Sequence, residues 1–288
     1  MTRKLVSPSE KRADRERKLN NRITEIDALR GIAIALVILD HLMYDVFFLM
    51  PNIFGFSSYN AGFWADFASL ARSYWRWDVR NYVRRFVLFI FLALTGVSCS
   101  FSRSNSKRAL KLGAIALILT AITVVADVIA NLHGRFVIVF GILHVMALSL
   151  FVVAIVERFT EEKFAYLVIG ALLVFAGAIF YNPFAVTPQQ FVVWEKFPTQ
   201  FLEAFIGTKL LGPDSYSFLF YGGQVFIGVF LGKLLYPERR SIVFKKGYIR
   251  GPLTFFGRHS LVVYIAHQII IPVVLGVLLL ASGYNLKF

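Results

Sequence analysis

The chain has 288 residues, of which 57% are hydrophobic and 17% are charged, against about 25% charged residues in a typical soluble domain. Its net charge of +14 would suit a nucleic-acid-binding protein, but a soluble domain of this length does not need 30 phenylalanines. The composition predicts an all-α, polytopic membrane protein. It excludes collagen-like, disordered and disulfide-framework classes, since the one cysteine, Cys99, lies in an apolar segment.

Seven apolar stretches are long enough to cross a bilayer, which takes about 17 to 25 mainly apolar residues in a helix. In chain order they cover residues 28–50, 86–102, 110–129, 136–156, 164–180, 218–236 and 260–282. We therefore expect a basic tail over residues 1–27 and a transmembrane domain over residues 28–288. The tail has no apolar run, so the first span is expected to be an uncleaved anchor.

Basic residues are concentrated in alternate connections between these spans. Segments 1–30, 103–111, 157–163 and 237–259 carry 21 Lys and Arg, and the intervening segments carry 9. Because basic flanks stay on the cytoplasmic side, we expect a cytoplasmic N-terminus, an external C-terminus and a location in the cell's inner, cytoplasmic membrane. The basic cluster in residues 11–22 would also attract anionic lipid. This distribution by membrane side argues against nucleic-acid binding.

Two external connections, 51–85 and 181–217, are long and rich in aromatic residues. They contain all four tryptophans, Trp64, Trp75, Trp77 and Trp194. Tryptophans near a bilayer are commonly interfacial anchors. Since loops of this length are usually structured or functional, the alternative is a cover over a site that opens outward.

The first span carries a row of ionisable residues, which are costly inside a membrane and usually functional there. Arg30 and His41 are eleven residues apart, which brings them within about 20° of the same helix face and about 16 Å apart along the axis. Asp45, four residues after His41, could hydrogen-bond and orient its ring. Asp40 points about 100° away from His41 and is expected to be the weaker partner.

Two further histidines lie within predicted spans, His144 in 136–156 and His267 in 260–282. His144 is expected at a similar depth to His41. Three buried histidines could bind a metal, but none is spaced as a short ligand pair, so no metal is expected. An interhelical hydrogen bond is the ordinary alternative for His144 and His267.

Arginines recur every fourth residue before the second span, at Arg72, Arg76, Arg80 and Arg84, followed by Arg85. On one helix they would form a slowly drifting row. Such a row is either a solvated face in contact with lipid headgroups or an anion-binding wall. Arg84 and Arg85 are the better candidates for a site, because they border the hydrocarbon and need partners there. The roles of the other three arginines stay open.

Four segments carry a resemblance to a known family. They read EIDALRGIAIALVILDHLMYD, RRFVLFIFLALTGVSCSFSRS, FGILHVMALSL and FGRHSLVVYIAHQIII. Their order and spacing resemble the heparan-α-glucosaminide N-acetyltransferase-like branch of the transmembrane acyltransferase superfamily. The chain departs from the family pattern at His259, where a small polar residue is common, and in having fewer spans than many relatives.

The resemblance implies an enzyme that takes an acetyl group from cytoplasmic acetyl-CoA and delivers it to a hydroxyl or amine, commonly of a sugar, on the external side. Arg30 would then lie near the CoA end. His41 would act as general base or accept the acetyl group itself, with Asp45 orienting it. His144 and His267 match motif positions and would line the same cavity. The resemblance also makes a homodimer plausible.

Two other functions remain open from the sequence. A proton-coupled transporter for a small anion or a lipid-linked solute could use the buried histidines and aspartates as a relay. A non-catalytic scaffold would keep the fold and tolerate loss of His41. An acyltransferase, by contrast, needs both Arg30 and His41 on one path. The acceptor and the acyl group cannot be read from the sequence.

Overall fold

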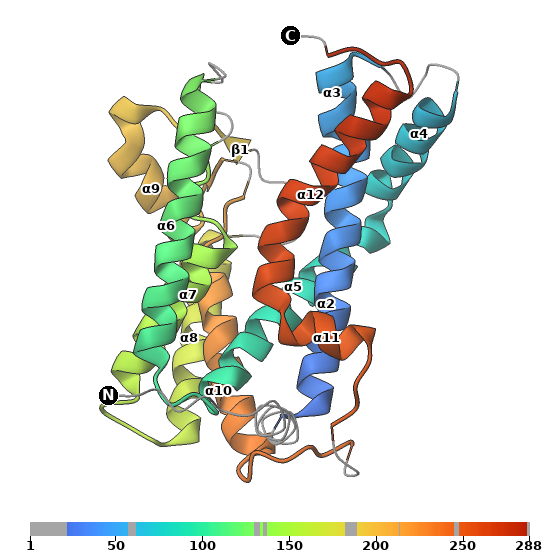
Figure 1. The fold of residues 1–288 in the computed structure, drawn as a ribbon. Helices are drawn as coiled ribbons and strands as arrows, with labels where there is room; N and C mark the ends of the chain where they lie inside the picture. The colour runs from blue at the N-terminus through green and yellow to red at the C-terminus, as the bar shows by residue number, and fades with distance from the viewer. Residues whose placement is uncertain are drawn as a thin grey trace, which may run out of the picture. The chain divides into compact units, whose positions relative to one another are not determined.

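The computed structural model describes residues 22–56, 62–129, 133–134, 137–181, 189–212, 214–244 and 248–286, and these are almost entirely helical (Figure 1). The basic tail predicted for residues 1–27 lies outside the described residues up to position 21. The chain divides into two compact units. One comprises Met1–Phe91 with Arg240–Phe288, and the other comprises Leu92–Arg239.

Within the described residues, six helical segments are long and apolar enough to cross a membrane. They are Thr24–Phe54, Asp78–Cys99, Asn105–Ile129, Lys163–Phe180, Phe218–Leu235 and Ser260–Ala281. Each coincides with a predicted span to within a few residues, except that the second begins eight residues earlier than expected. The remaining predicted span, 136–156, is a helix of 15 residues, Ile142–Val156, which is shorter than a full crossing needs. The protein is therefore a multi-pass helical membrane protein.

The first unit is built around the long N-terminal helical segment and the last helix of the chain. Its elements are α2 (Thr24–Tyr44), the π-helical turn η1 (Asp45–Leu49), α3 (Met50–Phe54), α4 (Phe63–Arg76), the first part of α5 (Asp78–Cys99), α11 (Pro252–Arg258) and α12 (Ser260–Ala281). Helix α12 packs along α2, η1 and α3, and α4 packs on the same segment (Figure 1).

Tryptophans of the long connection 51–85 take two different positions in the first unit. Trp64 is buried in an apolar cluster with Phe54 and Leu279, and its Nε1 donates a hydrogen bond to Ser282 Oγ at 3.0 Å. Trp77 is 57% exposed, as an interfacial anchor would be. The connection is thus largely helical and contributes to the core.

Helix α11 lies against the first turns of α2 because two glycines leave room for the backbones to meet (Figure 1). A Cβ on Gly31 of α2 would collide with the backbone of Leu253, and a Cβ on Gly257 of α11 would collide with the backbone of Asp27. Small residues at helix crossings permit this close approach in membranes. The contact fixes the start of α2, where Arg30 lies.

Replacing Gly257 with valine is expected to break this contact. The added side chain has no space between the two backbones, so the free energy of unfolding should fall by about 3 kcal/mol or more. Thermal unfolding in detergent measures the loss. Gly251→Ala is the matched control, because a Cβ there would meet nothing within 4 Å, and it should unfold like the wild type. Equal stability of both variants would contradict the packing described here.

In the described part of the chain, the second unit consists of the end of α5, five further helices, two short strands and two short helical turns. Its elements are α6 (Asn105–Ile129), α7 (Ile142–Val156), α8 (Lys163–Phe180), β1 (Gln189–Gln190), η2 (Trp194–Lys196), α9 (Phe197–Ile206), β2 (Leu210–Leu211), η3 (Phe218–Gly222) and α10 (Gly223–Leu235). The two short strands pair in parallel. Gly96 meets the backbone of α10, and Gly170 meets Gly223, so small residues again bring helices close.

Candidate active site

Helix α2 carries Arg30 and His41 on one uninterrupted stretch. It runs from Thr24 to Tyr44 and has acidic residues in its first turn. Their negative charge stabilises the helix by interacting with the positive end of its dipole. The α-helical rise per residue therefore applies between these two positions, which places them about 16 Å apart along the helix axis. His41 lies in the last turn and is half-buried.

The His41 ring contacts the ring of His267 on α12. The ring centroids are 4.8 Å apart and the planes meet at 89°, an edge-to-face arrangement. His267 is 5% exposed and also lies against Tyr264, with 5.5 Å between the ring centroids. The structure thus brings together two of the three histidines predicted within spans.

Beside His41, Asp40 is held in a buried cluster that the sequence did not predict. Arg80 of α5 donates two hydrogen bonds to the carboxylate, from Nε at 2.7 Å and from Nη2 at 2.8 Å. The hydroxyl of Tyr74 donates a third at 3.0 Å. The Arg80 guanidinium lies 3.4 Å from the ring centre of Trp75, a cation–π contact. Burial, followed by the charge of Asp40, raises the pKa of Tyr74, so its hydroxyl stays protonated as a donor.

The arginine row is divided between two helices. Helix α4 ends at Arg76, Trp77 is extended (φ −72°, ψ 115°), and α5 begins at Asp78. The arginines therefore do not form one helical face. Arg80 is the buried member, at 5% exposure, and no spacing rule could have paired it with an aspartate forty positions earlier.

Arg84 and Arg85, the two arginines favoured from the sequence, lie at the edge of this cluster. The side chain of Arg84 is 46% exposed, and its Nε is 3.9 Å from Asp40 Oδ2, a second and weaker ion pair. The guanidinium of Arg85 lies 5.8 Å from the ring centre of Tyr82. Arg80 therefore neutralises Asp40, and Arg84 presents more of its charge to the surroundings.

Asp45 does not occupy the position that the sequence suggested. It begins the π-helical turn η1, and its side chain is buried at 8% exposure. Within the described residues its carboxylate forms no hydrogen bond to His41. The backbone N–H of Asp45 still donates to the carbonyl of His41, so the α-helical spacing is kept and the register change of the π-helical turn comes only after Asp45. The ring of His41 has His267 as its neighbour instead.

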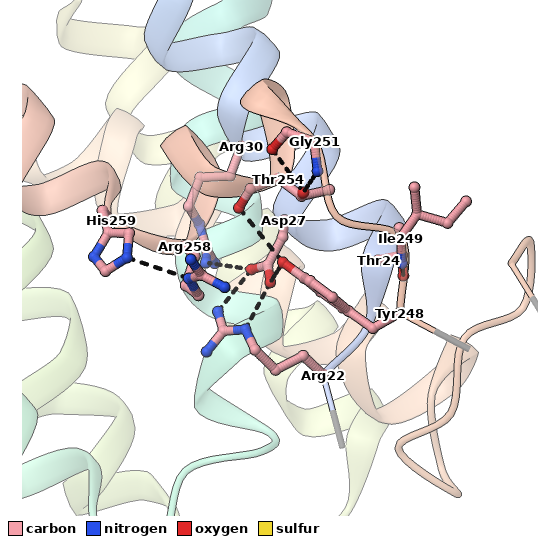
Figure 2. Close-up of polar contacts among 10 residues, drawn as sticks. All are labelled: Arg22, Thr24, Asp27, Arg30, Tyr248, Ile249, Gly251, Thr254, Arg258 and His259. Atoms are coloured by element: carbon pink, nitrogen blue, oxygen red, sulfur yellow. Dashed lines mark hydrogen bonds and ion pairs between the residues drawn. The ribbon is translucent and has the colours of Figure 1, made fainter. Parts of the chain in front are cut away.

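At the start of α2, the carboxylate of Asp27 contacts side chains from the N-terminal and the C-terminal parts of the first unit's sequence (Figure 2). Arg22 donates to both carboxylate oxygens, at 2.7 and 2.8 Å, and the hydroxyl of Tyr248 donates at 3.1 Å. Nη1 of Arg30 is 3.9 Å from Oδ1. The hydrogen bond to Asp27 raises the pKa of Arg22, while burial and then the charge of Asp27 raise the pKa of Tyr248.

Further polar contacts lie on the segments that pack against the start of α2. Arg258 of α11 donates from Nε to Nε2 of His259, 3.2 Å away (Figure 2). The backbone N–H of Ile249 donates to Thr24 Oγ1 at 3.2 Å, which fastens the preceding segment to α2. At the start of α2, two guanidinium groups, those of Arg22 and Arg30, thus lie against the carboxylate of Asp27.

His144 belongs to the second unit, where both ring nitrogens are used. Nδ1 accepts a hydrogen bond from the N–H of Gly141 at 3.2 Å, so the ring hydrogen is on Nε2. Nε2 lies 3.1 Å from Thr120 Oγ1, whose hydroxyl donates to the carbonyl of Ile138 at 2.7 Å. This is an interhelical hydrogen bond between α7 and α6, the ordinary alternative expected for His144.

The first unit thus has an imidazole pair and a charged cluster among helices long enough to cross a membrane. Within the described ranges, no group of three or more His, Cys, Asp or Glu is arranged to hold a metal ion. These features define the chain as a multi-pass membrane protein with a polar site among its helices, the type of site expected for a membrane enzyme or transporter.

The comparison with protein families decides between these classes. The family described as heparan-alpha-glucosaminide N-acetyltransferase, catalytic, matches residues 22–269. The chain belongs to this family, and the resemblance noted from its sequence is confirmed. Family membership makes it a membrane acetyltransferase. No curated protein and no solved structure matches the chain.

Proposed function

We propose that the protein transfers an acetyl group from cytoplasmic acetyl-CoA to a hydroxyl or amine of a sugar or glycan on the external side of the cell membrane. Family membership supports acetyl transfer. One observation supports placing the reaction at this site. The imidazole of His41 on α2 is half-buried, and its ring nitrogens form no hydrogen bond within the described residues. A side chain of this kind is available for proton transfer or nucleophilic attack.

Arg30 is the proposed contact for the phosphates of CoA. It lies near the start of α2, where it and Arg22 both face the carboxylate of Asp27. Guanidinium groups suit phosphate because they offer several donors in one plane. The thioester would then extend along α2 toward His41. The basic flanks of the spans support a cytoplasmic location for this end.

His41 is the proposed reacting group. As general base it would take the proton of the acceptor while the new bond to the acetyl carbon forms and the carbon–sulfur bond breaks, and the proton would then pass to the CoA thiolate. As nucleophile it would take the acetyl group first and deliver it in a second step. Asp45, Arg84, Arg85 and His267 are proposed to line the cavity around it. A homodimer and contact of the basic tail with anionic lipid are part of the proposal.

The direct test is release of free CoA by purified protein in detergent, given acetyl-CoA and glucosamine. Wild type should release CoA, and Arg30→Ala should raise the half-saturating acetyl-CoA concentration about tenfold, since one phosphate contact is lost. Arg103→Ala, an exposed arginine outside the first unit, should leave it unchanged. If the wild type neither binds nor consumes acetyl-CoA with sugar or membrane extracts supplied, the proposal fails, and proton-coupled transport into vesicles becomes the assay.

A further inference from the structure

The hydrogen positions of the His267 ring follow from its contacts. Nδ1 lies 3.2 Å from the backbone carbonyl oxygen of Val263, one turn earlier on α12. A carbonyl oxygen only accepts hydrogen bonds, so Nδ1 carries the hydrogen and donates it. In the neutral ring, Nε2 is therefore the nitrogen with the free lone pair.

This nitrogen is buried and lacks a hydrogen-bond partner among the described residues. His267 as a whole is only 5% exposed. A buried acceptor without a donor costs about 1 to 3 kcal/mol, so one that persists calls for a functional or structural explanation. The ring packs against two other rings, those of His41 and Tyr264.

His41 is a suitable donor to this nitrogen. Its own ring nitrogens form no hydrogen bond within the described part of the chain, and a neutral imidazole always has one N–H to donate. Two imidazoles joined by a hydrogen bond of about 3 Å have ring centres about 5 Å apart. The observed separation is 4.8 Å, with the planes at 89°. The two rings are not hydrogen-bonded as they stand, so the bond proposed below requires the His41 ring to turn until its N–H faces Nε2.

We propose that His267 is the residue that positions the ring of His41. The sequence had suggested Asp45 for this role. Its Nε2 accepts the N–H of His41 and so fixes one tautomer of that ring. The other nitrogen of His41 then carries its lone pair toward the reacting atoms. This role rests on the proposed acetyl transfer, and it identifies the group that orients His41 for that reaction.

The same contact serves both forms of the proposed reaction. When His41 takes a proton from the acceptor or an acetyl group from the thioester, its ring becomes positively charged. The N–H shared with His267 then becomes a stronger, charge-assisted hydrogen bond, which stabilises that state. No atom is transferred to His267, and its hydrogen bond to Val263 stays in place.

Two amide substitutions separate positioning from packing. His267→Asn keeps a donor at the Nδ1 position, which can still bind the Val263 carbonyl, but has no acceptor at the Nε2 position. His267→Gln extends its amide to the Nε2 position and can accept from His41. We expect the Asn variant to lower kcat for CoA release about 100-fold or more, with the half-saturating acetyl-CoA concentration within about threefold of wild type. The Gln variant should return kcat to within about tenfold of wild type.

A purely structural role would give a different pattern. Equal losses in both variants, or an Asn variant with kcat within about threefold of wild type, would overturn the proposal while leaving acetyl transfer intact. Absence of CoA release by the wild type would overturn acetyl transfer and this inference together. Should the Asn variant fail to fold, the spectrum of wild-type protein with 15N-labelled histidine decides. One fixed neutral tautomer at His41 supports the proposal, and averaged tautomers contradict it.

Discussion

Replacing Arg80 with methionine is expected to lower the free energy of unfolding by about 3 to 5 kcal/mol. The guanidinium is buried, with a side chain only 4% exposed, and it donates two short hydrogen bonds to Asp40. Without it, the carboxylate keeps its charge among apolar helices and loses its main partner. Thermal or denaturant unfolding in detergent measures the change.

Two further variants test whether the loss comes from the uncompensated charge. Arg84→Gln removes an exposed arginine 3.9 Å from the same carboxylate and should cost less than about 1 kcal/mol. Combining Asp40→Asn with Arg80→Gln leaves no net charge behind, so the double variant should be more stable than Arg80→Met. A double variant at least as unstable as Arg80→Met would show that packing of the arginine, for example on Trp75, determines the effect.

Replacing His41 with glutamine should lower acetyl transfer by about 1000-fold, the loss expected when a single acid–base or nucleophilic group is removed. Glutamine keeps much of the length and polarity of histidine but cannot accept a proton or an acetyl group at neutral pH. Binding of acetyl-CoA should persist, since the proposed phosphate contact is Arg30. Acetylated sugar and bound acetyl-CoA are measured in parallel.

His133→Asn is the matched control for this substitution. His133 is exposed and has a positive φ of 53°, a conformation that asparagine adopts more readily than most residues. This variant should keep full activity and stability. Activity of His41→Gln within about tenfold of wild type would remove His41 from the chemistry and favour the scaffold alternative.

The spans could be predicted from the sequence because the bilayer imposes a length and an apolar composition on each of them. Helix α2 shows the strength of this reasoning, since the predicted first span is indeed helical and Arg30 and His41 both lie on its uninterrupted α-helical part. The helix Ile142–Val156 shows its limit. Apolar composition continues through residues 137–141, but the backbone of these residues is not helical, and composition alone does not report that change.

The contacts of the site depend on tertiary packing and could not be predicted in the same way. Asp40 was expected to be the weaker partner because only its angle relative to His41 was known. Its role follows from Arg80 and Tyr74, which belong to other helices. Asp45 follows His41 at α-helical spacing, but spacing alone does not decide whether its carboxylate bonds the imidazole ring. The contact between His41 and His267 likewise depends on how α12 packs on α2.

The most direct test of the proposed function is sided acetyl transfer in reconstituted vesicles. Protein is inserted with its cytoplasmic face outward, glucosamine is enclosed, and acetyl-CoA labelled in the acetyl group is added outside. We expect labelled N-acetylglucosamine to accumulate inside vesicles with the wild type and to be lost with His41→Gln. Label that remains entirely on CoA with the wild type, or equal transfer by both proteins, would contradict acetyl transfer through His41.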